Sequence, residues 1–229
     1  MEKVSRAVED HLKMLYKLAE KQREEGLDKG VASSEMAQRL GVSPASISKT
    51  LKKLAEKGLV VHEPYYGAQL TETGRQIAVN LIRKHRILET YLVEKLGYGW
   101  DEVDAEAEVL EHAMSEKLTR QMWEALGKPS HDPHGSPIPS EGCDWPEIDW
   151  MPLSEVEVGS EVEVVRIRNS SPEVLRELQE AGVTIGEQVA LIQKNAEGWL
   201  IKGQNKEVLL VVSKQLAENI GVKRDTQDG

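Results

Sequence analysis

The chain has 229 residues, a net charge of −10 and 39% hydrophobic residues. This length allows one large domain or two to three small ones, while the lack of an apolar run of about 18 residues excludes a membrane-spanning helix. The charged, amphipathic N-terminus does not resemble a signal peptide, and the single cysteine, Cys143, suits a reducing compartment. We therefore expect a cytoplasmic protein with no membrane partner.

The charges are unevenly distributed along the chain. Residues 43–58 hold four lysines and one acid, whereas acids gather in 101–116 and 141–163. Net acidity argues against a nucleic-acid partner, because phosphate contacts require Lys and Arg. The distribution of the charges along the chain, however, decides whether such a partner can bind. The sequence predicts one basic end and one acidic end.

Residues 4–25 have the apolar period of an amphipathic helix, and the segment after them predicts a helix–turn–helix. Ser33 or Ser34 is a candidate N-cap for a short helix, and Gly41 suits the turn that ends it. Ser43 is the expected cap of a second helix, with Pro44 at its first position. The spacing is typical of a DNA-reading motif, although a small helical domain with a hairpin is the alternative.

In the next segment apolar and polar residues alternate on either side of a glycine turn. This pattern predicts a two-stranded wing, in which residues 59–62 pair with 68–71. Residues 1–74 are thus expected to form a winged helix–turn–helix domain. Lysines would contact phosphates, together with Tyr65 and Tyr66 of the wing, and small residues would approach base edges. The candidate DNA-binding residues of the second helix are Ser43, Pro44, Ala45, Ser46, Ser48, Lys49, Lys52 and Lys53.

Two long helices with apolar stripes are predicted over 75–97 and 101–127, and such a pair typically forms a dimer interface. Residues 128–151 are rich in Pro, Gly and acids and are expected to be a linker. Short strands and a capped helix over 152–224 indicate a small SH3-like β-barrel. The expected fold class is mainly α with α+β parts, in three domains joined in series.

The stretch "DAEAEVLEHAMS" has two interpretations. On a continuous helix, Asp104, Glu108, Glu111 and His112 lie within an arc of about 100°, beside a stripe that includes Met114 and Leu118. These groups form either a solvated acidic face or a set of metal ligands. Carboxylates crowded at the rim of a core repel one another, and a divalent cation would offset that repulsion.

The preceding helix favours the metal interpretation. His85 lies in its apolar stripe and Glu89 follows one turn later, while Asp10 on the first helix lies off the main stripe. A lone buried His is more often a core residue, but a His–Glu pair facing a helix with Glu, Glu and His is harder to explain in that way. Carboxylates with imidazole suit Mn²⁺, Fe²⁺ or Zn²⁺.

At this point the chain resembles the diphtheria toxin repressor and manganese transport regulator family of metal-dependent regulators. The resemblance rests on "EDHLKMLYKL", the helix–turn–helix, "LTETG", "RKHRILETYL", "EAEVLEHAMSEKL" and "PHGSPIP". It implies a homodimer that binds double-stranded operator DNA when a divalent metal is bound and represses metal-uptake genes.

The resemblance also implies a ligand set. Asp10, Glu108, Glu111 and His112 match the principal metal site, and His85, Glu89 and Asp104 match the ancillary site. Iron-responsive members typically carry Met and Cys at the positions of Asp10 and Glu108. Because both are carboxylates here, Mn²⁺ is the expected cofactor, with Fe²⁺ as the alternative and Co²⁺, Cd²⁺ or Zn²⁺ as surrogates.

Two other classes of protein stay open. A binuclear hydrolase could use the same His and Glu cluster to activate water. It would not need the lysines of the helix–turn–helix, and no nucleophile motif is present, so we assign no catalytic residues and do not expect an enzyme. A winged-helix regulator with an organic ligand is the third possibility, and DNA binding that ignores chelators would favour it.

Overall fold

The computed structural model describes residues 4–24, 26, 27, 29–63, 66–146, 149–168, 171–203 and 209–224. The chain divides into two compact units, one of Met1–Lys84 with Pro139–Asp144 and the other of His85–Ile138 with Trp145–Gly229. No helix of the described part is long and apolar enough to cross a membrane. Helix α4 (Glu72–Leu96) begins in the first unit and continues into the second.

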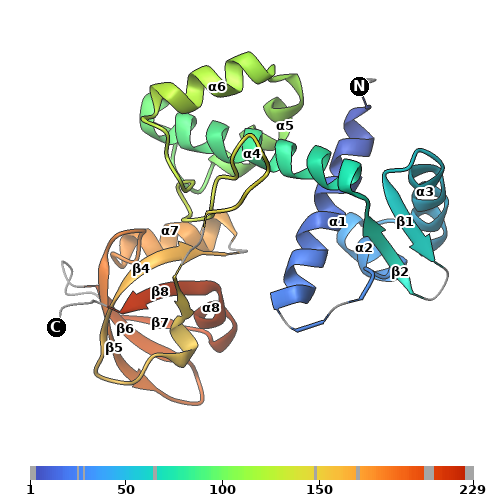
Figure 1. Ribbon diagram of the computed structural model, residues 1–229. Helices are drawn as coiled ribbons and strands as arrows, with labels where there is room; N and C mark the ends of the chain where they lie inside the picture. Colours follow the sequence, from blue (N-terminus) through green and yellow to red (C-terminus); the bar gives the residue numbers. More distant parts are fainter. Residues whose placement is uncertain are drawn as a thin grey trace. The chain divides into compact units, whose positions relative to one another are not determined.

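The first unit contains the predicted winged helix–turn–helix (Figure 1). Strands β1 and β2 pair antiparallel, with Val60 opposite Leu70, which confirms the expected wing. Ile47, Leu51 and Leu54 are almost fully buried and hold the second helix of the motif against the others. The elements are α1 (Arg6–Glu24), α2 (Ser33–Leu40), α3 (Pro44–Glu56), β1 (Val60–Glu63) and β2 (Gly67–Leu70).

The caps of α2 and α3 differ. The expected Ser43 cap of α3 is confirmed, because its hydroxyl accepts a hydrogen bond from the Ser46 amide. The expected serine cap of α2 is wrong, because Ala32 occupies that position and offers no side-chain acceptor. Glu35, in the first turn of α2, instead accepts a hydrogen bond from the Gln22 amide at 2.9 Å, which links α2 to α1.

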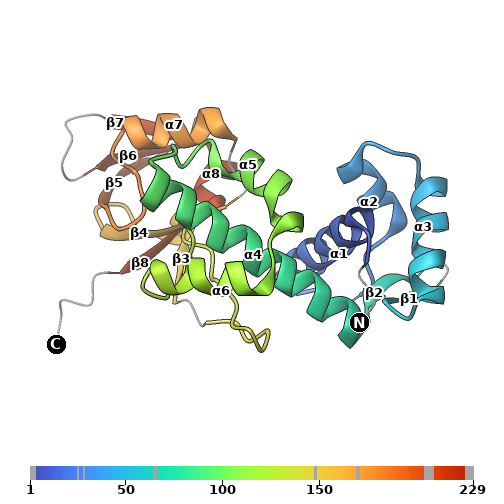
Figure 2. The same ribbon diagram turned by 90° about the horizontal axis from the view of Figure 1, so that it is seen from above.

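The helical part of the second unit packs α4 against three shorter segments around a shared apolar core (Figure 2). That core includes Leu88 and Leu92 of α4, Ala107, Met114 and Met122. The single helix expected over 101–127 is wrong, because the chain leaves the helical conformation at Met114 (ψ 126°) and Ser115 caps a new helix. The segments are α5 (Val103–Leu110), the 3₁₀ turn η1 (Glu111–Ala113) and α6 (Glu116–Ala125).

The rest of the second unit is an antiparallel six-stranded sheet in the order β3-β8-β4-β5-β6-β7, accompanied by two helices, which agrees with the SH3-like expectation. Ser171 caps α7 as expected, by accepting from the Val174 amide. The elements are β3 (Met151–Pro152), the 3₁₀ turn η2 (Leu153–Glu155), β4 (Glu161–Ile167), α7 (Pro172–Glu180), β5 (Gln188–Lys194), β6 (Trp199–Gly203), β7 (Leu209–Val212), α8 (Lys214–Asn219) and β8 (Ile220–Arg224).

Candidate metal centre

His85 on α4 lies at the centre of a group of three carboxylates, two of which are buried. Its Nδ1 is 2.6 Å from a Glu111 oxygen, and its Nε2 is 3.4 Å from Glu89 and 3.3 Å from Asp104. His85 and Glu89 are 5% and 3% exposed, whereas the Asp104 side chain is 71% exposed. The i, i+4 spacing on α4 explains why His85 and Glu89 share a face.

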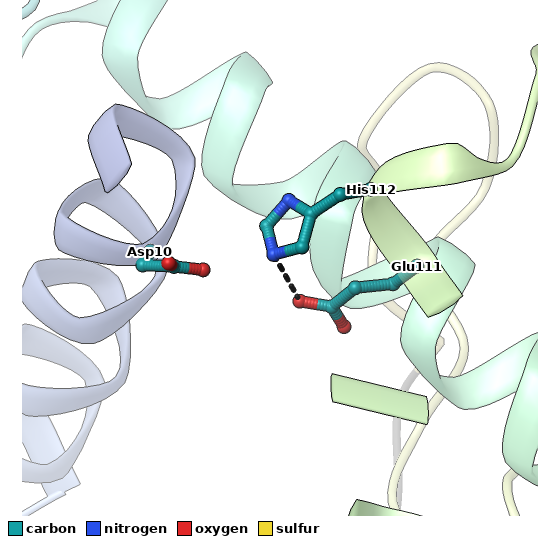
Figure 3. A group of neighbouring side chains, drawn as sticks. All are labelled: Asp10, Glu111 and His112. Atoms are coloured by element: carbon teal, nitrogen blue, oxygen red, sulfur yellow. Dashed lines mark ion pairs between the residues drawn. The ribbon is translucent and has the colours of Figure 1, made fainter. Parts of the chain in front are cut away.

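Glu111 and His112 lie in the tight turn η1 and not on a continuous helix (Figure 3). Glu111 is fully buried, and its second oxygen is 3.6 Å from Nε2 of His112. The expectation that Glu111 borders the core at its rim is therefore wrong. Its carboxylate points into the protein, where an unpaired charge would be costly.

The break after α5 also changes which apolar residues are buried. Met114 is buried as expected, together with Val103 and Ala107, but Leu118 is 46% exposed. The side chains of α6 point in different directions from those that a continuation of α5 would give them. Leu118 consequently does not lie on the apolar stripe on which a continuous helix would place it. Asp104 and Glu108 remain near His85, because one ligand atom from each of these three residues lies within 4.8 Å of the others.

Asp10 and the candidate DNA-binding residues belong to the first unit. Asp10 lies half-buried on α1 (Figure 3). On α3, Ser48 is half-buried and the other candidates are exposed, and Tyr66 at the wing is 77% exposed. Tyr65 lies outside the described residues. The exposed candidates are Ser43, Pro44, Ala45, Ser46, Lys49, Lys52 and Lys53.

A second cluster, which sequence reasoning missed, joins Glu89 to Asp132 and His134. Their ligand atoms lie within 4.8 Å of one another, and Nδ1 of His134 is 3.7 Å from Glu89 Oε1. Asp132 accepts hydrogen bonds from the amides of His134 and Ser136, which folds "DPHGS" into a tight loop. The signal was present in "HDPHG", but the segment was interpreted only as a linker.

The loop that carries Asp132 and His134 is held by contacts on both sides. Nε2 of His134 lies 2.7 Å from the carbonyl oxygen of Trp100, whose ring stacks on the imidazole at 5.8 Å. Gly135 has a φ of 78°, and a Cβ there would lie 2.0 Å from the carbonyl oxygen of Val165. Only glycine permits this close approach to β4.

The protonation of the buried groups reflects the crowding of charge. Burial would lower the pKa of His85, but the charge of Glu89 and hydrogen bonds to Asp104, Glu111 and Glu89 outweigh it and raise the pKa to about 10. Burial and the nearby Glu89 raise the pKa of Asp132. The charge of His85 and its hydrogen bond outweigh burial and lower the pKa of Glu89. A divalent cation would neutralise the same carboxylates.

The donors fit a hard or borderline cation, since they are carboxylate oxygens and imidazole nitrogens without a thiolate. Buried Glu89 and Asp132 lie beside His134, and Arg86, whose Nε is 3.6 Å from Asp132, also contacts this cluster. Asn169 and Ser170 of the C-terminal domain lie outside the described residues. The side chain of Glu173 is exposed and lies 3.6 Å from Arg176, so it lacks the burial that is usual for a metal ligand.

Three family models match the chain in succession. They are the iron dependent repressor N-terminal DNA binding domain (residues 3–68), the iron dependent repressor metal binding and dimerisation domain (71–140) and the FeoA domain (151–224). The chain is 36% identical over 141 residues to the iron-dependent repressor IdeR of Mycobacterium tuberculosis. That match covers 58% of this chain but only 60% of the length of IdeR.

Matches that span nearly the whole chain also occur. The diphtheria toxin repressor of Corynebacterium glutamicum is 31% identical over 208 residues, covering 86% of this chain and 87% of the relative. A solved manganese-dependent transcriptional repressor in complex with manganese is 33% identical, covers 95% of this chain and 99% of that chain, and has a TM-score of 0.82. The zinc-bound structure of ScaR is 27% identical with a TM-score of 0.76. The chain is a member of the diphtheria toxin repressor and manganese transport regulator family.

Proposed function

We propose that this chain is a metal-dependent transcriptional repressor that responds to Mn²⁺ and binds operator DNA as a homodimer. The observation that carries the proposal is the thiolate-free set of carboxylates and imidazoles, four of them buried, in a member of this family. We assign DNA reading to residues 1–74, dimerisation and metal binding to 75–127, and an accessory SH3-like role to 152–224, with 128–151 between them.

The principal metal centre is assigned to Asp10, Glu108, Glu111 and His112. The pairing of buried Glu111 with His112 supports it, and the resemblance supplies Asp10 and Glu108. A bound cation would supply positive charge that makes the approach of several carboxylates favourable. Because Asp10 belongs to α1 of the DNA-binding domain, metal occupancy would shift the population of that domain toward its operator-binding arrangement.

A second centre is assigned around Glu89. The sequence prediction grouped Glu89 with His85 and Asp104, and we include Asp132 and His134 as further donors, because they lie beside Glu89. Both groupings contain oxygen and imidazole nitrogen only, which supports Mn²⁺ over metals that prefer thiolate. Fe²⁺ remains the alternative activating metal, because the related repressors include iron-dependent proteins by name.

Two surfaces support the DNA and dimer assignments. The exposed lysines of α3 can contact phosphates, while the exposed small side chains at its N-terminal end can approach bases. On α5 and α6, Val109, Leu110 and Leu118 are 57%, 38% and 46% exposed, which suits a surface that a second copy covers. The hydrolase alternative explains neither surface.

Replacing Glu108 by Ala tests the proposal. The variant should lose Mn²⁺-stimulated binding to operator DNA, because a ligand of the principal centre is gone, while its circular dichroism stays unchanged. Fluorescence anisotropy with labelled operator DNA, with Mn²⁺ or with chelator, measures this. Glu106→Ala on the same helix is the matched control and should respond normally. Undiminished Mn²⁺ stimulation of DNA binding in Glu108→Ala would reject the assigned centre. Chelator-insensitive DNA binding by the wild-type protein would reject the assignment as a metal-dependent repressor.

A further inference from the structure

A cavity of about 430 Å³ lies within the second unit, between the last turns of α4 and the segment around α7. Its lining changes from exposed to buried residues, so the cavity opens to solvent at one end and closes inside the protein at the other. The exposed lining residues are Glu94, Tyr98 and Gln179, and the buried ones are Thr90, Trp100 and Asp132.

Asp132 belongs both to this lining and to the Glu89 cluster. Glu89 and Asp132 are only 3% and 8% exposed, so a cation has to cross part of the protein to reach them. A bare divalent ion is very costly in such surroundings, and the ion must keep part of its water shell until carboxylates replace it. A buried metal centre therefore needs a polar, hydrated entry path.

The cavity has the polarity and the size of such a path. Nε1 of Trp100 and Nε2 of His131 are buried, and neither has a hydrogen-bond partner in the part of the chain that the structure describes. Buried polar atoms are rarely left unpaired, and because both residues line the cavity, water inside it satisfies them. At about 30 Å³ per water molecule, the cavity also has room for an ion with about six waters.

The lining also supplies acceptors for the water shell of a cation, whose hydrogens point outward. The Thr90 hydroxyl donates its proton to the Arg86 carbonyl at 2.7 Å, which leaves its oxygen lone pairs to accept. Glu94 contributes a carboxylate at the exposed end, and the Lys95 ammonium 3.8 Å away offsets only part of its charge, since both side chains are solvated. A carboxylate at an entrance raises the local concentration of cations.

We propose that this cavity is the entry route by which a hydrated divalent cation reaches the Glu89 cluster. The inference rests on the proposed function, since it requires a metal centre around Glu89. An entry route determines how quickly the centre fills and empties, whereas the ligands determine its affinity. Blocking the cavity should therefore slow uptake and release equally and leave the equilibrium unchanged.

A reversible block tests the route in the full-length protein. In a Cys143→Ser background, Thr184→Cys places a single thiol on the half-buried lining, and benzyl methanethiosulfonate attaches a ring there that a reductant removes. Stopped-flow mixing with a fluorescent chelating dye follows uptake and release of Mn²⁺. One of two kinetic phases should slow at least about 10-fold in both directions, because the ion must wait for a local opening of the protein. Calorimetry should show unchanged affinities, and reduction should restore the rates.

Val158→Cys in the same background is the matched control, because it carries the same label at a position that is 54% exposed and outside the cavity lining. Its rates should equal those of the wild-type protein, and an equal slowing there would reject the route.

The remaining outcomes separate the route from the centre that it serves. Unchanged rates in labelled Thr184→Cys would overturn the route and direct the ion past His134, whose side chain is 14% exposed. A lost equivalent of Mn²⁺ or a lower affinity would make the cavity part of the centre and not a path to it. A wild-type protein that binds one equivalent would reject the second centre together with its route, and one that binds no Mn²⁺ would reject the proposed function itself.

Discussion

At the scale of single residues, His85 is charged in spite of its burial. Burial would lower its pKa, but the charge of Glu89 and hydrogen bonds to Asp104, Glu111 and Glu89 raise it to about 10. The metal-free protein therefore holds a proton where its carboxylates otherwise repel one another. Removing that proton without supplying a metal should destabilise the second unit.

The sign of the pH dependence follows from the raised pKa. The stabilisation by protonated His85 is fully present below the ordinary pKa of 6.5 and is lost as the pH rises through about 10. We expect the unfolding free energy of the metal-free protein to fall across this window more steeply in wild type than in His85→Gln. Urea denaturation in the presence of chelator, repeated over this pH range, measures the difference. Parallel curves would contradict the assigned charge state.

Glu108 determines the softness of the principal donor set. Replacing it by Cys should shift the metal preference toward Fe²⁺, because a thiolate is a softer ligand than a carboxylate. Operator binding titrated anaerobically with Mn²⁺ and with Fe²⁺ measures the shift. Glu106→Cys adds a thiol to the same helix away from the assigned centre and should leave the preference unchanged. Identical response curves for Glu108→Cys and wild type would contradict the role given to ligand softness.

At the scale of elements, helices and the wing could be predicted because their signals are local. Ser43, Pro44 and the buried stripe of α3 all lie within one segment. The break after α5 was missed because apolar periodicity continues through it, although Ser115 followed by Glu116 is the start signal of a helix. The cluster of Glu89 with Asp132 and His134 was missed because the packing of a loop brings its members together. The periodicity of apolar residues in the sequence does not reveal such packing.

The loop that carries Asp132 and His134 depends on Gly135. Replacing Gly135 by Ala should weaken Mn²⁺ binding and lower stability, because its Cβ would collide with the carbonyl of Val165 and displace His134. Gly127→Ala is the matched control, since it has the same φ of 78° but open space around it, and it should cost about 1 kcal/mol through backbone strain alone. Urea denaturation and Mn²⁺ titration of both variants provide the comparison. Equal losses of stability and of Mn²⁺ affinity in the two variants would show that the packing of this loop against Val165 is unimportant for both.

At the scale of the whole molecule, the proposed repressor needs two copies to match a two-fold operator. The exposed apolar side chains of α5 and α6 are the proposed contact. Leu118→Glu should yield a monomer that binds operator DNA weakly yet keeps its affinity for Mn²⁺. Light scattering after size-exclusion chromatography measures the mass. Val158→Glu introduces the same charge at another exposed apolar position, 54% exposed, and should leave the mass unchanged. If the Leu118→Glu variant had the mass of the wild-type protein, the dimer interface would have to lie elsewhere on the chain.

The stacking of Trp100 on His134 gives the protein a built-in optical reporter. All five tryptophans, at positions 100, 123, 145, 150 and 199, lie in the second unit, and the first unit has none. Intrinsic emission excited at the indole band therefore comes only from the unit that carries the Glu89 cluster. Because Trp100 is 5.8 Å from the His134 ring, paramagnetic Mn²⁺ held there would quench its emission. Metal occupancy can thus be followed without a label, separately from DNA binding.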